Sequence, residues 1–210
     1  MDEGHRFPLR IVDGLRLDKP LRDALMPGRI VLDDAGRERM LPRFFYEVQT
    51  WTQASEVKLS PSFALAELIQ TDVREAAPLR GFPRYVPCAI TLTALGLERF
   101  REAAGTFVHV AANGGYRSPR HSVSASASPH SWATAVNIYR IGDMYLDTRD
   151  AVERYASLAR DELPGVWTRP FGTHRGQTTD HLHLDFGYVV STPREAPERH
   201  LEFDLERRAS

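Results

Sequence analysis

Short segments in which apolar and polar residues alternate dominate the beginning of the chain. Residues 9–17, around Gly14, and residues 29–41 each enclose a glycine-containing turn signal, and each predicts a hairpin. The aromatic run at 44–51 predicts a further strand. We therefore expect residues 1–55 to form a small β-rich N-terminal extension.

Helical periodicity begins after this extension. A first helix is expected to start with Ser60 as its N-cap, a second spans residues 91–104, and a third runs from about 148 to 163. Each of the last two ends at a glycine or a Pro-Gly pair, which is typical of helix termini. The apolar residues that we place near one face of the second helix are Leu92, Leu95 and Phe100.

The remaining apolar runs are short and predict strands. These runs are residues 106–112, 135–141, 144–146, 167–172 and 181–189. Loops separate them, most clearly the serine-rich segment 122–128. Because helices and strands do not alternate regularly, the expected fold class is α+β, with one main domain over residues 56–192. The charged residues 193–210 are expected to form a peripheral C-terminal tail.

Composition excludes several classes of function. At 210 residues the chain is long enough for one core with a small appendage. A net charge of −1 without a long basic run argues against a nucleic-acid partner, and no apolar stretch is long enough to span a membrane. Residues 1–6 are polar and lack the pattern of a secretory signal, so a cytoplasmic location, or export by another route, is expected. The oligomeric state is not indicated.

The last predicted strand carries several polar residues. Side chains two apart on a strand share a face, so His181, His183 and Asp185 project together while Leu182 faces the core. Asp180 lies just before the strand, where a loop can bring its carboxylate to the same face. A functional site and a solvated sheet face both give this pattern, and the strand alone does not distinguish them.

A second segment supplies further groups of the same kind. His130 follows the serine-rich loop, and Asn137 lies on the next strand, where it shares a face with the small residues Ala133 and Ala135. Two histidines, a side-chain oxygen and a nearby carboxylate are the parts of a zinc site that leaves one position open for water. A single histidine is more often a hydrogen-bonded structural residue than a ligand. The two histidine segments together favour a site.

A third segment contains an arginine directly after a tight turn. Gly114 and Gly115 permit the turn, and Arg117 stands at its exit. A guanidinium there can bind a carboxylate or stabilise negative charge on a carbonyl oxygen. A structural arginine that pairs with an acid would give the same sequence.

In this order, the three segments resemble a known family. Residues 115–118 (GYRS), 128–137 (SPHSWATAVN) and 180–183 (DHLH) are similar to the motifs of the zinc D-Ala-D-Ala carboxypeptidase and L-alanyl-D-glutamate peptidase family. The likeness covers about residues 58–190. It implies a Hedgehog/DD-peptidase fold, in which helices flank an antiparallel sheet. It also implies a zinc metallopeptidase, a hydrolase of carboxypeptidase or endopeptidase type that acts on peptidoglycan stem peptides of the cell wall or other D-amino-acid-containing peptides.

The resemblance implies roles for five residues besides the metal ligands. Asp180 would be the general base, and Arg117 would stabilise the oxyanion or anchor the substrate. Ser128 would contact the substrate or support the neighbouring histidine, and Tyr116 would be a further substrate contact. His181 takes the place of the first histidine in the His-x-His motif of related cell-wall metallopeptidases, where it assists catalysis.

The resemblance assigns the Zn²⁺ ligands to His130, Asn137 and His183, with one important departure. Asn137 stands where the family has an aspartate, and a neutral amide attracts Zn²⁺ less than a carboxylate does. Ala133 also replaces a family glycine. Three arrangements follow: Asn137 ligates weakly, His181 completes a three-histidine site, or the site holds no metal.

The same departure leaves three classes of function open. The first is a zinc peptidase acting on a peptide or peptidoglycan-stem substrate. The second is a catalytically inactive domain of the same fold that binds a cell-wall peptide or a protein partner. The third is a structural or assembly role that uses the N-terminal extension.

Overall fold

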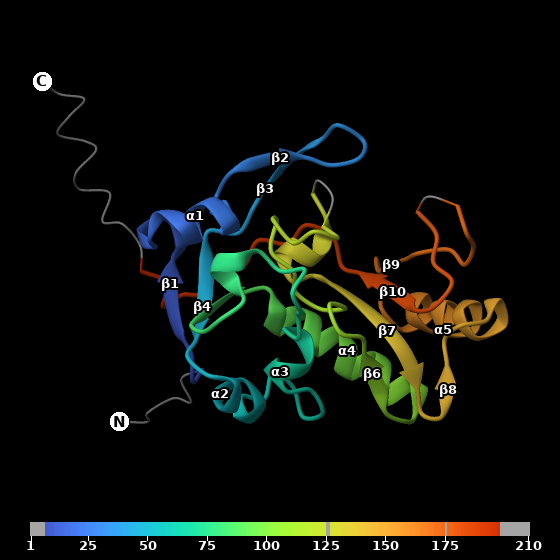
Figure 1. Cartoon of the computed structure of the whole chain (residues 1–210). Coiled ribbons are helices and arrows are strands. Elements are labelled where there is room, and N and C mark those ends of the chain that lie inside the picture. The colour runs from blue at the N-terminus through green and yellow to red at the C-terminus, as the bar shows by residue number, and fades with distance from the viewer. Residues whose placement is uncertain (1–6, 125–126, 175, 198–210) are drawn as a thin grey trace, which may run out of the picture.

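The computed structural model describes residues 7–124, 127–174 and 176–197 as an α+β protein with antiparallel sheets (Figure 1). Its α-helices are α1 (Lys19–Leu25), α2 (Trp51–Glu56), α3 (Leu65–Leu68), α4 (Ile90–Ala104) and α5 (Arg149–Glu162). Its 3₁₀ turns are η1 (Gly14–Arg16), η2 (Ala77–Leu79) and η3 (Pro129–Trp132). Its strands are β1 (Arg10–Asp13), β2 (Ile30–Leu32), β3 (Glu38–Met40), β4 (Phe44–Val48), β5 (Arg84–Pro87), β6 (Val108–Val110), β7 (Ala135–Ile141), β8 (Met144–Tyr145), β9 (Trp167–Thr168) and β10 (Leu182–Asp185).

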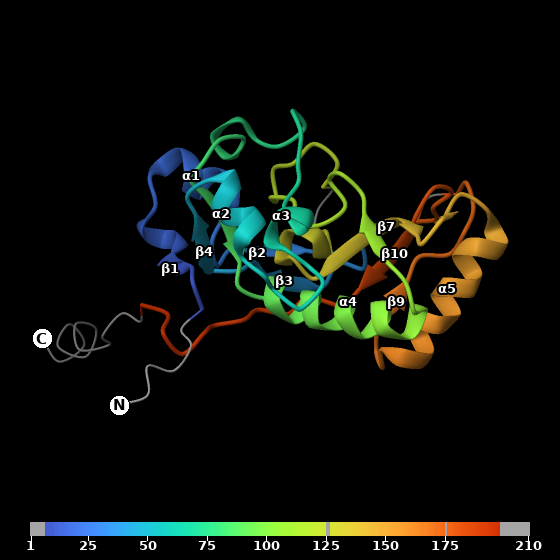
Figure 2. The same ribbon diagram turned by 90° about the horizontal axis from the view of Figure 1, so that it is seen from below.

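The largest sheet has the strand order β6-β7-β10-β9, with β8 paired to the outer part of β7. Val136, Ile138, Leu182 and Leu184 from its two central strands are buried and belong to the main hydrophobic cluster. Helices α4 and α5 contact each other, and α5 also contacts β9 and β10 (Figures 1 and 2). One face of the sheet is therefore core, and the opposite face is available for polar side chains.

A second sheet joins the N-terminal region to the rest of the molecule. Its order is β1-β4-β5, and β5 lies well beyond residue 55. Tyr46 pairs with Val86 across β4 and β5, and both lie in the same hydrophobic cluster as the large sheet. The predicted extension 1–55 thus shares both a sheet and a core with the predicted main domain, because β4 needs a partner on each side.

The two hairpins predicted in this region had different outcomes. The hairpin at 29–41 is confirmed as β2 and β3, with Asp33 accepting hydrogen bonds from the backbone of Ala35 and Arg37 in the turn. The hairpin around Gly14 is wrong, because β1 leads into η1 and pairs with β4 instead. Gly14 is needed for close packing there: a Cβ would lie 2.6 Å from the Phe45 ring.

Two helix predictions also need correction. Ser60 does not begin a helix, because its hydroxyl donates to Glu98 of α4 at 2.9 Å and the nearest helix is the short α3. On α4 itself, Phe100 is buried as expected, whereas Leu92 and Leu95 are exposed. The buried face of α4 is centred on Ile90, Ala94 and Leu97, which lie on the opposite side of the helix from Leu92.

Other expectations are confirmed. β7 spans the predicted strand 135–141, and α5 starts after Thr148, whose hydroxyl oxygen accepts the amide hydrogen of Ala151. Of the predicted tail, residues 198–210 lie outside the described residues, while Ala196 is buried in the main cluster. Among the residues that the structure describes, no helix is both long and apolar enough to cross a membrane.

Candidate functional site

The register of the large sheet places polar side chains side by side on the face away from the core. His183 of β10 is paired with Asn137 of β7, and Asp185 is paired with Ala135 on one side and Trp167 on the other. Directly paired residues of antiparallel strands point to the same face. The His183 Nδ1 atom lies 2.8 Å from the Asn137 Oδ1 atom. This agrees with the alternation expected around His183, and we call this surface the polar face.

Arg169 lies on the other side of His183 and was missed by the sequence reasoning. It follows β9 directly, and its backbone N–H donates to the His183 carbonyl at 3.3 Å. Continuing the pairing of Thr168 with Leu184 brings Arg169 opposite His183, on the polar face. The Trp167 ring lies 5.7 Å from the His183 ring. The sequence contains a signal for this placement, because Trp167 and Arg169 are two residues apart in the predicted strand 167–172 and therefore share a face.

His130 reaches the same place from η3. Its ring centroid is 5.2 Å from that of His183, and its Nδ1 atom lies 2.8 Å from the Gly115 carbonyl oxygen. A carbonyl only accepts hydrogen bonds, so Nδ1 carries the proton and Nε2 has a free lone pair. That Nε2 atom is buried and has no hydrogen-bond partner within the described part of the chain.

The loop that carries Arg117 is fixed against both histidine-bearing segments. The Asn137 N–H donates to the Gly114 carbonyl at 2.7 Å, and the Arg117 N–H donates to the His130 carbonyl at 3.2 Å. Gly115 passes so close to α3 that a Cβ there would lie 2.1 Å from the Leu68 carbonyl oxygen. The glycines of this loop therefore permit a close approach that brings Arg117 to the polar face.

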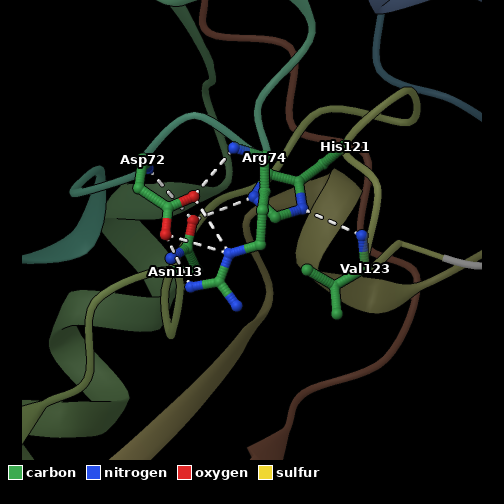
Figure 3. Close-up of polar contacts among 5 residues, drawn as sticks. All are labelled: Asp72, Arg74, Asn113, His121 and Val123. Carbon is green, nitrogen blue, oxygen red and sulfur yellow. Dashed lines mark hydrogen bonds and ion pairs between the residues drawn. The ribbon is translucent and has the colours of Figure 1, made fainter.

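A polar network with the buried residues Asn113 and His121 and the exposed pair Asp72 and Arg74 supports the same loop (Figure 3). Asn113 adopts a left-handed conformation with φ 57°, and its Oδ1 accepts the Asp72 N–H at 3.2 Å. The buried His121 ring bonds at both nitrogens, with Nε2 2.9 Å from Asn113 Oδ1 and Nδ1 accepting the Val123 N–H at 3.2 Å. Arg74 pairs with Asp72 at 2.6 Å. This network, which sequence reasoning also missed, holds both ends of the segment that contains Arg117.

His181 and Asp180 form a pair at the edge of the polar face. His181 Nδ1 lies 2.6 Å from an Asp180 carboxylate oxygen and 3.0 Å from the Thr178 hydroxyl. The Asp180 side chain is 80% exposed, whereas His181 Nε2 is buried and lacks a hydrogen-bond partner among the described residues. The carboxylate therefore orients the His181 ring, with Nε2 turned inward.

The structure places the two remaining predicted contacts differently. Tyr116 does not face this site, because its side chain is buried in the main cluster and lines an internal cavity with Glu75 and Leu79. Tyr116 and Arg117 follow Gly115 directly, and their side chains point in different directions. Arg117 reaches the polar face, while Tyr116 enters the core. Ser128 is half-buried at the start of η3 and makes no side-chain capping bond there.

Burial and the two arginines keep the site histidines neutral. Burial lowers the pKa of His130 well below its ordinary value, and the Arg117 charge lowers it further. Burial also lowers the pKa of His183 well below its ordinary value, with Arg169 as the next cause. The pKa of Arg117 itself falls to about 10 through burial and the neighbouring Arg169 charge. Neutral imidazole is the form that binds metal ions.

The donor atoms fit a zinc ion in kind, although the charge is unusual. His130 Nε2, His183 Nδ1 and Asn137 Oδ1 would supply two nitrogens and one oxygen. Asn137 Oδ1 only accepts hydrogen bonds, so His183 Nδ1 carries a proton in the pair, and this proton would have to move to Nε2 before Nδ1 could bind a metal ion. Tetrahedral ligands are about 3.3 Å apart at ordinary zinc–ligand distances, so Asn137 and His183 would separate by roughly 0.5 Å. The described residues contain no group of three His, Cys, Asp or Glu placed to hold a metal ion. The amide oxygen therefore stands where a carboxylate would be expected.

Comparison of the chain with protein-family models, curated proteins and solved structures gives no significant match.

Proposed function

We propose that this protein is a zinc-dependent peptidase with a Hedgehog/DD-peptidase fold that hydrolyses peptidoglycan-type or other D-amino-acid-containing peptides. The observation that carries the proposal is the buried, unbonded Nε2 atom of His130, in a ring 5.2 Å from that of His183. A buried nitrogen without a partner is costly unless it serves a ligand. The order of the three sequence motifs and the antiparallel sheet that carries them support the fold.

The proposed metal ligands are held by three different elements. His130 Nε2, His183 Nδ1 and Asn137 Oδ1 would hold the ion, with the Gly115 carbonyl fixing the tautomer of His130 through a hydrogen bond of 2.8 Å. Bound zinc supplies Lewis-acid polarisation and a water of lowered pKa. This is the chemistry that amide hydrolysis requires.

The remaining residues stabilise the developing negative charge of the substrate and accept the proton of the attacking water. Arg117 stabilises negative charge that develops on the substrate carbonyl oxygen, because a backbone hydrogen bond holds this residue beside His130 and its Nε atom has no partner among the described residues. Asp180 and His181 share a hydrogen bond of 2.6 Å and together take up the proton of the attacking water. His181 Nε2 is the buried end of that pair, and Asp180 stabilises the protonated ring.

Metal content tests this proposal most directly. We expect one zinc ion per chain after equilibration of the purified protein with zinc and removal of the excess, and its loss in His130→Ala and His183→Ala. The matched control is His174→Ala, since His174 is exposed on a loop and should have no effect on zinc. Zinc-dependent release of alanine from D-Ala-D-Ala peptides, absent in Arg117→Gln, would support the reaction. A wild-type protein that binds no zinc would overturn it.

One observation favours a second candidate function. Asn137 and His183 already satisfy each other at 2.8 Å, and neither carries a negative charge that would attract a metal ion. A catalytically inactive domain that binds a cell-wall peptide or a protein partner would have such a pair. Binding of a stem peptide with unchanged affinity after removal of zinc would identify this second function.

A further inference from the structure

Two half-buried arginines of the polar face form no ion pair among the described residues. The Nε atoms of Arg117 and Arg169 are fully buried and unbonded, and neither side chain forms an ion pair with any of the described residues. Asp185 shares the polar face, yet its carboxylate accepts the Gly187 N–H at 2.7 Å rather than pairing with Arg169. The charge of Asp185 still acts on Arg169, but the site contains two guanidinium groups and no ion pair among the described residues.

The positions of the two arginines differ. The backbone N–H of Arg117 donates a hydrogen bond to the His130 carbonyl, whereas the backbone N–H of Arg169 donates one to the His183 carbonyl. They thus approach the two histidines from different elements, the loop after β6 and the end of β9. Each lowers the pKa of His183, and Arg169 lowers the pKa of Arg117, so their charges act on the same small region.

Such an arrangement is unfavourable unless an anion binds. A buried charge without a partner destabilises a protein by several kcal/mol, and two like charges add repulsion. Arginine binds carboxylates through two parallel hydrogen bonds, which suits a planar acid group. Trp167 lies beside His183 and is 49% exposed, so it offers an apolar surface to the residue that bears the acid group.

We propose that Arg169 is a second anion-binding residue of this site, which binds a carboxylate of the substrate next to the scissile bond and leaves Arg117 for the oxyanion. The identity of the substrate as a peptide rests on the proposed function, but the carboxylate site does not require zinc. The carboxylate has two sources, the C-terminal α-carboxyl group or an acidic side chain. Arg169 therefore selects peptides that are negatively charged beside the bond to be cut.

Binding to the zinc-free protein tests the proposal. The probes are N-acetyl-D-alanine, its uncharged amide, and N-acetyl-D-glutamate α-amide, which carries only a side-chain carboxylate. We expect at least one acid to bind roughly tenfold or more tightly than the amide, and Arg169→Gln to remove that difference while Arg169→Lys keeps part of it. The acid that binds better identifies the source. Arg154→Gln, on the exposed side of α5, is the control.

Three results would overturn the proposal. The first is equal binding of both acids and the amide by the wild-type protein, or no binding of any probe. The second is unchanged acid binding in Arg169→Gln. The third is a larger loss of acid binding in Arg117→Gln than in Arg169→Gln, which would contradict the division of roles.

Thermal unfolding separates ligand binding from a structural role. Arg169 is half-buried and forms no ion pair among the described residues, so Arg169→Gln should leave the melting temperature of the free protein unchanged or raise it. A large fall would make Arg169 a structural residue and overturn the proposal. Zinc titration of the same variants keeps the two proposals distinct: selective acid binding without zinc binding refutes only the peptidase, and zinc binding without acid selectivity refutes only the role of Arg169.

Discussion

The molecule contains two asparagine–histidine pairs that look alike and have different surroundings. Asn113 and His121 are joined at 2.9 Å, and Asn137 and His183 at 2.8 Å. In the first pair both ring nitrogens of the histidine are bonded, and a neighbouring backbone N–H also bonds the asparagine oxygen. The second pair lies beside His130, whose outer nitrogen has no partner in the described residues. We interpret the first pair as a structural unit and propose that the second is part of a ligand site.

This difference in hydrogen bonding supports the proposal that the second pair belongs to a ligand site. Buried polar groups are normally satisfied, and those that are not concentrate where binding or catalysis occurs. The first pair has one exception, the Asn113 amide nitrogen, whereas the polar face holds unbonded buried nitrogens on His130, His181, Arg117 and Arg169. These four residues come from separate segments, and further unbonded buried atoms belong to Arg84, Tyr116, Ser124, Ser131 and Arg140.

The largest expected effect is on zinc affinity, which should distinguish the Asn137–His183 pair from the Asn113–His121 pair. His183→Ala should weaken zinc binding by on the order of 100-fold or more, since it removes a ligand. His121→Ala should leave the zinc affinity of the folded protein unchanged and lower the free energy of unfolding by roughly 1–3 kcal/mol, because it leaves buried partners unbonded. Calorimetric zinc titration and urea unfolding measure the two quantities. Equal zinc loss in both variants would contradict the distinction.

The same substitution in both asparagines should have opposite consequences. Asn137→Asp adds the missing negative charge and should raise zinc affinity by about tenfold or more. Asn113→Asp places a charge beside Asp72 in a buried network and should destabilise the protein by roughly 1–3 kcal/mol. The measurements are zinc competition with a chelator and chemical unfolding at pH 7. A gain in zinc affinity from Asn113→Asp would show that our assignment of the two pairs is wrong.

Stability should fall as the pH is lowered below about 6.5. Burial lowers the pKa of His121 from its ordinary 6.5, so the unfolded chain binds a proton that the folded chain does not. Its stabilising effect is present above pH 6.5 and is lost as the pH falls through the lowered pKa. His121→Gln should reduce the slope of unfolding free energy against pH by up to about 1.4 kcal/mol per pH unit. The exposed His174→Gln should leave the slope unchanged, and an unchanged slope in His121→Gln would refute this account.

The smallest expected effect concerns residues whose backbone adopts a left-handed conformation. Asn113 and Ala133 both have φ 57°, a conformation that asparagine tolerates and alanine does not favour. Ala133→Gly relieves that cost but removes a buried methyl group, so the net change in unfolding free energy should be less than about 1 kcal/mol. Thermal unfolding measures this change, and a loss above about 2 kcal/mol would show that packing outweighs backbone strain.

Sequence patterns predicted the polar face better than the loops that support it. The alternation of leucine and histidine around His183 is local, so β10 could be identified with its core and polar faces. Arg169 was missed because its role depends on the pairing of β9 with β10, which brings together residues 14 apart. Ser60 was misjudged as a helix cap because its partner, Glu98, is 38 residues away.

The sequence alone determined the α+β class, the strand of Asn137, the helix after Thr148 and the three motifs that resemble a zinc peptidase. These features depend on periodicity and on turn chemistry, which act between near neighbours. Only the tertiary structure decided that Tyr116 enters the core, that β4 joins the N-terminal region to β5, and that Arg169 lies beside His183. The physical reason is that strand pairing and burial bring together residues far apart in the sequence, and they decide which buried nitrogens find a hydrogen-bond partner.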